Sequence, residues 1–247
     1  GFRLIEVSTA PHHLDVSDGA RVEEVAALVR GEGLHVHSLH APFGHDVNFT
    51  SPEEPQRRRA LDTLIRAADA LAKFHGRLYV IHPGGEDQRW IWDRERRLDL
   101  AVKGLGTIWK VCRERGLRLV VETPLPHLLG GQVEDFAWIL ERLPEEGTGV
   151  CIDTSHAALG GNLSTLVQRF GARLMHVQAS DNRGVTDDHL PPGEGALDWT
   201  AIIAALRSVR YRGAFLLEVS GDGVLEDRLR RVAEAVGRLG RLSEALS

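Results

Sequence analysis

Seven short apolar runs alternate with longer segments of helical periodicity along this chain of 247 residues. The apolar runs have the length and the Val, Ile and Leu content of buried parallel strands. We expect strands at residues 3–8, 34–40, 77–82, 118–122, 149–153, 173–178 and 214–219. We expect helices at residues 22–30, 53–74, 94–115, 133–143, 163–170, 199–209 and 225–245. Repetition of strand and helix in this order predicts a parallel sheet covered by helices.

The length of the chain and the number of repeats favour one α/β domain over residues 1–247, a TIM (β/α)8-type barrel. Barrels of about 250 residues form a single core. No Pro-, Gly- or Ser-rich linker divides the sequence into two compositions. A closed barrel of this type has eight strands, and seven are readable here. Either the first βα unit is absent from this sequence, which we favour, or the barrel is incomplete.

The composition indicates which partners and which cellular compartment to expect. A formal net charge of −5 and a pI near 6.2 give no general attraction to nucleic acid. Cys112 and Cys151 fall in a predicted helix and a predicted strand, which is not the pattern of a disulfide framework and favours a reducing setting. We find no apolar stretch of about 20 residues and no signal-peptide pattern at the start. We expect a soluble, cytoplasmic protein that binds no membrane. The sequence does not predict an oligomeric state.

Metal-binding residue types stand at the ends of four consecutive predicted strands: Glu122, Asp153, His176 and Glu218. The carboxyl ends of the strands form the catalytic face of a β/α barrel. A single residue of this kind is usually a structural hydrogen-bonding group, but four at the same depth in successive repeats favour a shared ion. Carboxylate and imidazole ligands without paired thiolates suit Zn²⁺ or Mn²⁺. We expect a divalent metal site.

Seven motifs in order resemble those of the xylose-isomerase-like TIM barrels, which include sugar isomerases, ketose 3-epimerases and abasic-site nucleases of the endonuclease IV type. The resemblance covers essentially the whole chain. The motifs are HAPF at 40–43, HPGG at 82–85, ET at 122–123, DTSHA at 153–157, HVQASD at 176–181, DDHLPPGEG at 187–195 and LEVS at 217–220.

The isomerase and epimerase branch implies that Glu122, Asp153, His176 and Glu218 hold one ion. It implies proton transfer next to a carbonyl through an enediolate, with Glu122 and Glu218 as the acid and base. His156 matches a position that contacts substrate oxygens. Arg183 stands where an anionic or polar substrate group is often held, although a solvated loop arginine is an equal alternative. The expected partner is a small sugar or sugar phosphate, and this is our first hypothesis.

The nuclease branch, our alternative, implies three zinc ions bound at nine positions. Each position has a permitted residue here: His40, His82, Glu122, Asp153, His156, His176, Asp187, His189 and Glu218. Against it, the segment after Glu122 contains prolines, and the chain is shorter than the nucleases. The basic runs at 57–59 and 94–97 lie in predicted helices, where solvated faces are expected. A metal-binding barrel without catalytic activity is a third possibility.

Overall fold

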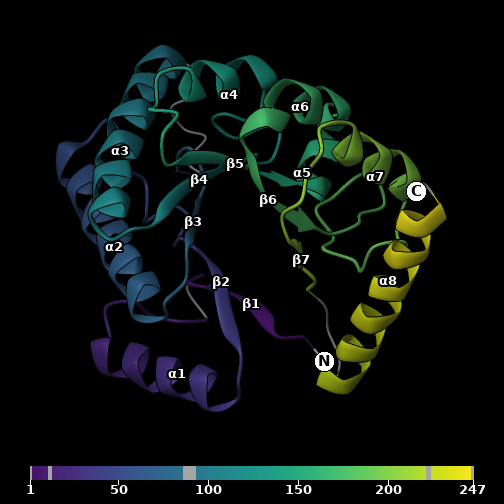
Figure 1. Cartoon of the computed structure of the whole chain (residues 1–247). Coiled ribbons are helices and arrows are strands. Elements are labelled where there is room, and N and C mark those ends of the chain that lie inside the picture. Colours follow the sequence, from purple (N-terminus) through teal and green to yellow (C-terminus); the bar gives the residue numbers. More distant parts are fainter. Residues whose placement is uncertain (1, 11–12, 86–92, 221–223, 246–247) are drawn as a thin grey trace. The chain divides into compact units, whose positions relative to one another are not determined.

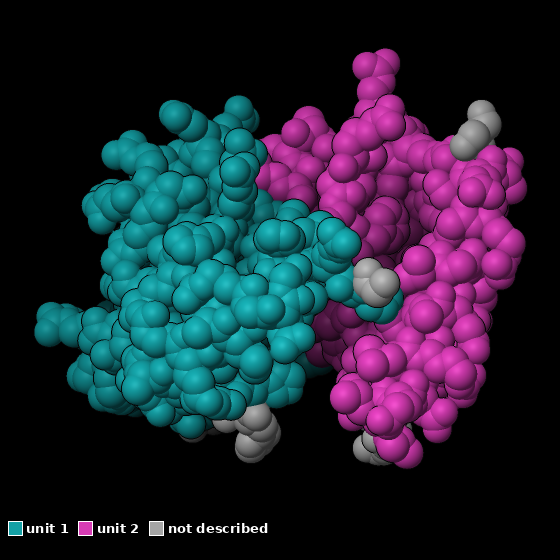
Figure 2. All heavy atoms as spheres, turned by 60° about the horizontal axis from the view of Figure 1, so that its bottom comes forward, with its two compact units in different colours: residues 1–122, 127–149 teal, residues 123–126, 150–247 magenta. Residues whose placement is uncertain are grey.

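The computed structural model describes residues 2–10, 13–85, 93–220 and 224–245. The chain forms two compact units, coloured separately in Figure 2. Unit 1 comprises residues 1–122 and 127–149, and unit 2 comprises residues 123–126 and 150–247. The expectation of a single domain over 1–247 stays a prediction. Each unit is described by itself below.

Unit 1 contains four parallel strands that pair in sequence order. A helix follows each strand, so the unit is a run of βα repeats (Figure 1). The elements are β1 (Leu4–Ser8), α1 (Gly19–Gly31), β2 (His35–His40), α2 (Glu54–Lys73), β3 (Leu78–Ile81), α3 (Arg94–Glu114), β4 (Arg118–Glu122) and α4 (Val133–Leu140). Helices α2 and α3 pack against each other, and α3 packs on β4.

The core of unit 1 lies between its strands and the apolar faces of its helices. Helix α3 buries side chains at intervals of three and four residues, which are Leu98, Ala101, Leu105, Ile108 and Cys112. This spacing places them on one face of the helix. The Tyr79 hydroxyl donates to the Leu64 carbonyl at 2.7 Å, and burial raises the pKa of that hydroxyl well above its usual value. Cys112 and Cys151 are buried and form no disulfide, as the sequence predicts.

Unit 2 contains the three parallel strands that complete the chain, again paired in sequence order. Its elements are β5 (Thr148–Asp153, from residue 150 onward), α5 (Thr154–Leu159), α6 (Leu163–Phe170), the 3₁₀ turn η2 (Gly171–Arg173), β6 (Leu174–Ala179), α7 (Trp199–Ser208), β7 (Phe215–Leu217) and α8 (Leu225–Ala245). Helix α7 contacts both α6 and α8. Asp198 caps α7 by accepting the Ala201 N–H at 3.0 Å, as expected for an N-cap aspartate.

All seven predicted strands and all seven predicted helices are present, with ends shifted by up to three residues. Helix α5 was not predicted, because six residues are too few to show a helical period. The solvated face expected for the basic run at 94–97 is wrong for Arg97, which is 6% exposed and donates to the Gly85 carbonyl at 3.0 Å. No helix within the described ranges has the length and apolar character needed to cross a bilayer.

Candidate functional site

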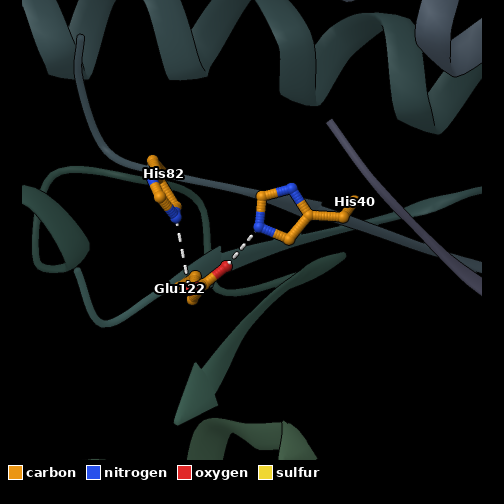
Figure 3. A group of neighbouring side chains, drawn as sticks. All are labelled: His40, His82 and Glu122. Atoms are coloured by element: carbon orange, nitrogen blue, oxygen red, sulfur yellow. Dashed lines mark hydrogen bonds and ion pairs between the residues drawn. The ribbon is translucent and has the colours of Figure 1, made fainter. Parts of the chain in front are cut away.

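Unit 1 brings together three of the predicted site residues at the carboxyl ends of neighbouring strands. His40 ends β2, His82 directly follows β3, and Glu122 ends β4. One carboxylate oxygen of Glu122 lies 2.9 Å from His40 Nε2, and the other lies 3.2 Å from His82 Nε2 (Figure 3). The Phe43 ring lies 5.1 Å from both imidazole rings. We call His40, His82 and Glu122 the first group; all three side chains are buried.

The two hydrogen-bond partners of His40 indicate which of its ring nitrogens carries a proton. Its Nδ1 lies 2.9 Å from the Ala41 carbonyl oxygen, which can only accept, so Nδ1 carries a proton. Its Nε2 faces a carboxylate oxygen, which also only accepts when ionised. The contact between Nε2 and Glu122 therefore needs a proton, on the ring or on the carboxyl group, or a cation. Histidines that bind metals usually donate their other ring N–H to such a carbonyl.

Unit 2 brings together three further predicted residues, His156, Asp187 and His189, which we call the second group. A single carboxylate oxygen of Asp187 lies 3.1 Å from His156 Nε2 and 2.8 Å from His189 Nε2. The Nδ1 atoms again face backbone carbonyls, at 3.0 Å from Thr123 for His156 and 3.2 Å from Glu218 for His189. As in His40, Nδ1 of both histidines faces a group that can only accept, and Nε2 faces a carboxylate. The second group therefore also suits a cation.

The second group shifts the pKa values of its members in opposite directions. Burial alone would lower the pKa of His189, but its hydrogen bond to Asp187 and the charges of Glu218, Asp187 and Asp153 outweigh burial and raise that pKa to about 9. Burial would raise the pKa of Asp187, but hydrogen bonds from His156 and His189 hold it well below its usual value. Three carboxylates of unit 2 thus act on one imidazole.

The remaining predicted residues lie in or beside the strands of unit 2. Asp153 ends β5 and caps α5 by accepting the His156 backbone N–H at 2.8 Å. His176 is fully buried in β6, where its Cα pairs with that of Cys151, and Glu218 directly follows β7. Arg183 lies on an exposed loop, with a guanidinium nitrogen 3.8 Å from Asp188. The expectation that these residues stand at the same depth is wrong for His176, which lies three residues before the end of β6. That Asp153, His176 and Glu218 share an ion stays a prediction.

Sequence reasoning missed the residues that hold the second group in place. The Ser155 hydroxyl donates to Asp187 at 2.7 Å and accepts from the Asn182 side-chain amide at 2.8 Å. Asp181 is fully buried under the segment that carries Asp187 and His189. Ser155 and Asp181 lie inside the DTSHA and HVQASD motifs and Asn182 directly follows the second motif, but no spacing rule separates these residues from their neighbours.

In metal-free buffer, the free energy of unfolding should fall as the pH rises from about 6.5 to about 9. The ordinary pKa of His189 is 6.5, and the folded protein raises it to about 9. Stabilisation by the protonated imidazole is therefore complete below the lower value and is lost as the pH passes the higher one. Urea unfolding at several pH values measures this effect. His189→Gln should remove that part of the pH dependence, and an unchanged profile in the variant would show that another group causes it.

The chain is similar to known proteins over most of its length. The family model described as "Xylose isomerase-like TIM barrel" matches residues 1–242. A solved D-tagatose 3-epimerase-like protein superimposes with a TM-score of 0.86 at 22% identity, over 99% of this chain and 90% of that one. The D-psicose 3-epimerase of Agrobacterium fabrum is 24% identical over 88% of this chain and 75% of its own length. A probable endonuclease 4 of Methanosphaera stadtmanae is 24% identical over 82% of this chain and 78% of its own length.

Proposed function

Because the chain belongs to the xylose isomerase-like TIM barrel family, we propose that it is a metal-dependent isomerase or epimerase of a sugar or sugar phosphate. Likeness to two proteins named as ketose 3-epimerases supports an enzyme of this kind. The observation that carries the proposal is the contact of carboxylates with imidazoles in two groups, one buried at the strand ends of unit 1 and one half-buried in unit 2, since such sets need a cation or protons. Proton transfer at carbon needs the same groups.

The donor set fits a divalent ion. The proposed ligands are Glu122, Asp153, His176 and Glu218, which offer oxygen and imidazole nitrogen of the kinds that Zn²⁺ and Mn²⁺ accept. Glu122 and Asp153 end their strands, Glu218 directly follows β7, and His176 lies three residues before the end of β6. Glu122 belongs to unit 1 and the other three to unit 2. Their meeting at one ion is therefore proposed from the order of their motifs in a chain of this family. When bound, the ion would supply Lewis acidity toward a carbonyl and its neighbouring hydroxyl.

The residues of the chain would then have separate tasks. Glu122 and Glu218 are the proposed acid and base, one removing the proton next to the carbonyl and the other returning it. His40 and His82 hold both oxygens of Glu122, so that its orientation is fixed before substrate arrives. His156 is proposed to contact substrate oxygens. Arg183, with an exposed side chain, is proposed to meet a phosphate or hydroxyl at the entrance.

A panel of ketoses and ketose phosphates incubated with the metal-loaded enzyme in D2O tests the proposal. The proposed chemistry exchanges the proton next to the carbonyl with solvent. NMR should therefore show one deuterium at that carbon in the product and an isomer or epimer accumulating. Conversion without deuterium would exclude proton exchange with solvent. A filled metal site with no conversion on this panel or on an abasic duplex would instead support a metal-binding barrel without activity.

Hydrolysis at abasic sites in DNA by a three-zinc centre is a second candidate function. One observation favours it: His40, His156 and His189 lie outside the proposed four-ligand set, yet all three have Nδ1 on a carbonyl and Nε2 on a carboxylate. The relative named as a probable endonuclease 4 agrees with this reading. Cleavage of an abasic duplex, with no activity on ketoses, would establish the nuclease instead.

A further inference from the structure

Asp181 carries a fully buried carboxylate just beyond β6, and four N–H groups point at it. One of its oxygens accepts the backbone N–H of Asn182 at 2.9 Å and of Leu197 at 3.1 Å. The other accepts the backbone N–H of Gly193 and the indole N–H of Trp199, both at 2.8 Å. A carboxylate with four such donors is satisfied in its charged form. Asp181 is therefore an anchor for the loop around it.

The anchored segment is the one that carries His189. The backbone of Asp181 pairs with that of Leu190 through two hydrogen bonds of 2.8 Å, forming an isolated antiparallel bridge. Leu190 follows His189 directly, and residues 190–197 turn around the Asp181 carboxylate. We call this segment the 190–197 turn. His189 itself has a φ of 46°, which is uncommon for a residue with a side chain. The Asp181–Leu190 bridge and the Asp181 carboxylate hold the backbone that follows His189 in the sequence.

The turn leaves no room at Gly195. A Cβ at this position would lie 2.3 Å from the near oxygen of Asp181 and 2.4 Å from the Asn182 carbonyl oxygen. The absence of a side chain is thus what lets the turn close on the carboxylate. On its outer side, Glu194 is held by Arg231 of α8 at 3.1 Å, so the turn is fixed from both faces.

We propose that Asp181 is a positioning residue that fixes His189 in the second group, by holding the 190–197 turn through its carboxylate. This inference rests on the proposed function, in which His156, the proposed contact to substrate oxygens, shares the Asp187 carboxylate with His189. Asp181 itself touches neither substrate nor ion in this account. Its effect reaches the site through the Asp181–Leu190 bridge and the backbone next to His189.

Asp181→Asn is the sharpest variant, since its shape is retained. In the wild-type protein each carboxylate oxygen of Asp181 faces two N–H donors. In Asp181→Asn, either orientation of the new side-chain amide places its NH2 group against two of these donors. Displacement of His189 should shift Asp187 and, through it, His156, the proposed substrate contact. We expect kcat/KM to fall by about 100-fold, the scale for a misplacement of about 1 Å. The Kd for Mn²⁺ should not change, because the four proposed ligands lie outside the turn.

Asp135→Asn provides the matched control, because Asp135 is also a buried carboxylate but lies in α4 and pairs with Arg94 at 2.9 Å. Gly195→Ala is a second test variant, because the added Cβ would clash with the Asp181 carboxylate. Its control is Gly240→Ala, where an added Cβ has no neighbour within 4 Å. Gly195→Ala should lower kcat/KM as Asp181→Asn does, and the double variant should lose no more than either single variant. The two controls should retain wild-type kcat/KM.

An NMR readout separates this inference from the proposed function. In the metal-free protein, the imidazole resonances of His189 should move in Asp181→Asn and Gly195→Ala but not in the controls. Amide hydrogen exchange at Gly193 and Leu197 should speed up in the same two variants. If the wild-type protein converts no ketose, the proposed function fails while these two readouts still decide the role of Asp181. Unmoved His189 resonances in Asp181→Asn would overturn the inference.

Discussion

Replacing Glu218 with Gln should lower kcat by about 10²- to 10⁴-fold, the range for loss of a general acid or base. Glu218 directly follows β7, and its charge contributes to the raised pKa of His189, so the carboxylate acts on the second group. The substitution keeps the shape of the side chain and removes its ability to take a proton. Deuterium incorporation from D2O, measured on the ketose that the wild-type enzyme converts, gives the rate.

The same substitution could weaken ion binding, since Glu218 is also a proposed ligand. The ion content of the purified variant must therefore be measured beside its rate. A variant that retains its ion and loses turnover supports the acid–base role. Glu226→Gln changes an exposed glutamate in the first turn of α8 and should leave both properties unchanged. Wild-type turnover in Glu218→Gln would remove Glu218 from the mechanism.

Removing the divalent ion with a chelator should lower turnover by about 10³-fold or more. Stabilisation of developing charge by a bound ion is worth several kcal/mol, and each 1.36 kcal/mol corresponds to about a tenfold change in rate. Adding Mn²⁺ or Zn²⁺ back should restore activity. The melting temperature should rise with ion concentration, because a ligand that binds only the folded state stabilises it. Full turnover after complete removal of the ion would contradict the proposed chemistry.

The strand–helix order could be predicted from the sequence because buried parallel strands are nearly uniform in composition. The runs ending at Glu122 and Asp153 show this most clearly, since each breaks from apolar to polar at the residue where the strand ends. The ends of the strands, and the motifs that follow them, also supplied the predicted site residues. His40, His82 and Glu122 lie together in unit 1, as do His156, Asp187 and His189 in unit 2.

Contacts that depend on chain segments far apart in sequence could not be predicted. Nothing near Asp181 in the sequence indicates that Gly193, Leu197 and Trp199 donate to its carboxylate. The burial of Arg97 is similar, because its partner carbonyl at Gly85 lies 12 residues away across a segment outside the described ranges. The proton positions on the imidazoles also follow from backbone carbonyls that only the fold brings near.

Titration of the metal-free protein with Mn²⁺ or Zn²⁺, with bound ions counted by elemental analysis and turnover followed in parallel, shows how many ions the reaction needs. One ion per chain should give full isomerase or epimerase activity, and Asp153→Asn or His176→Gln should weaken binding of that ion. Three zinc ions per chain, with cleavage of an abasic duplex appearing only as the last of them binds, would contradict this expectation.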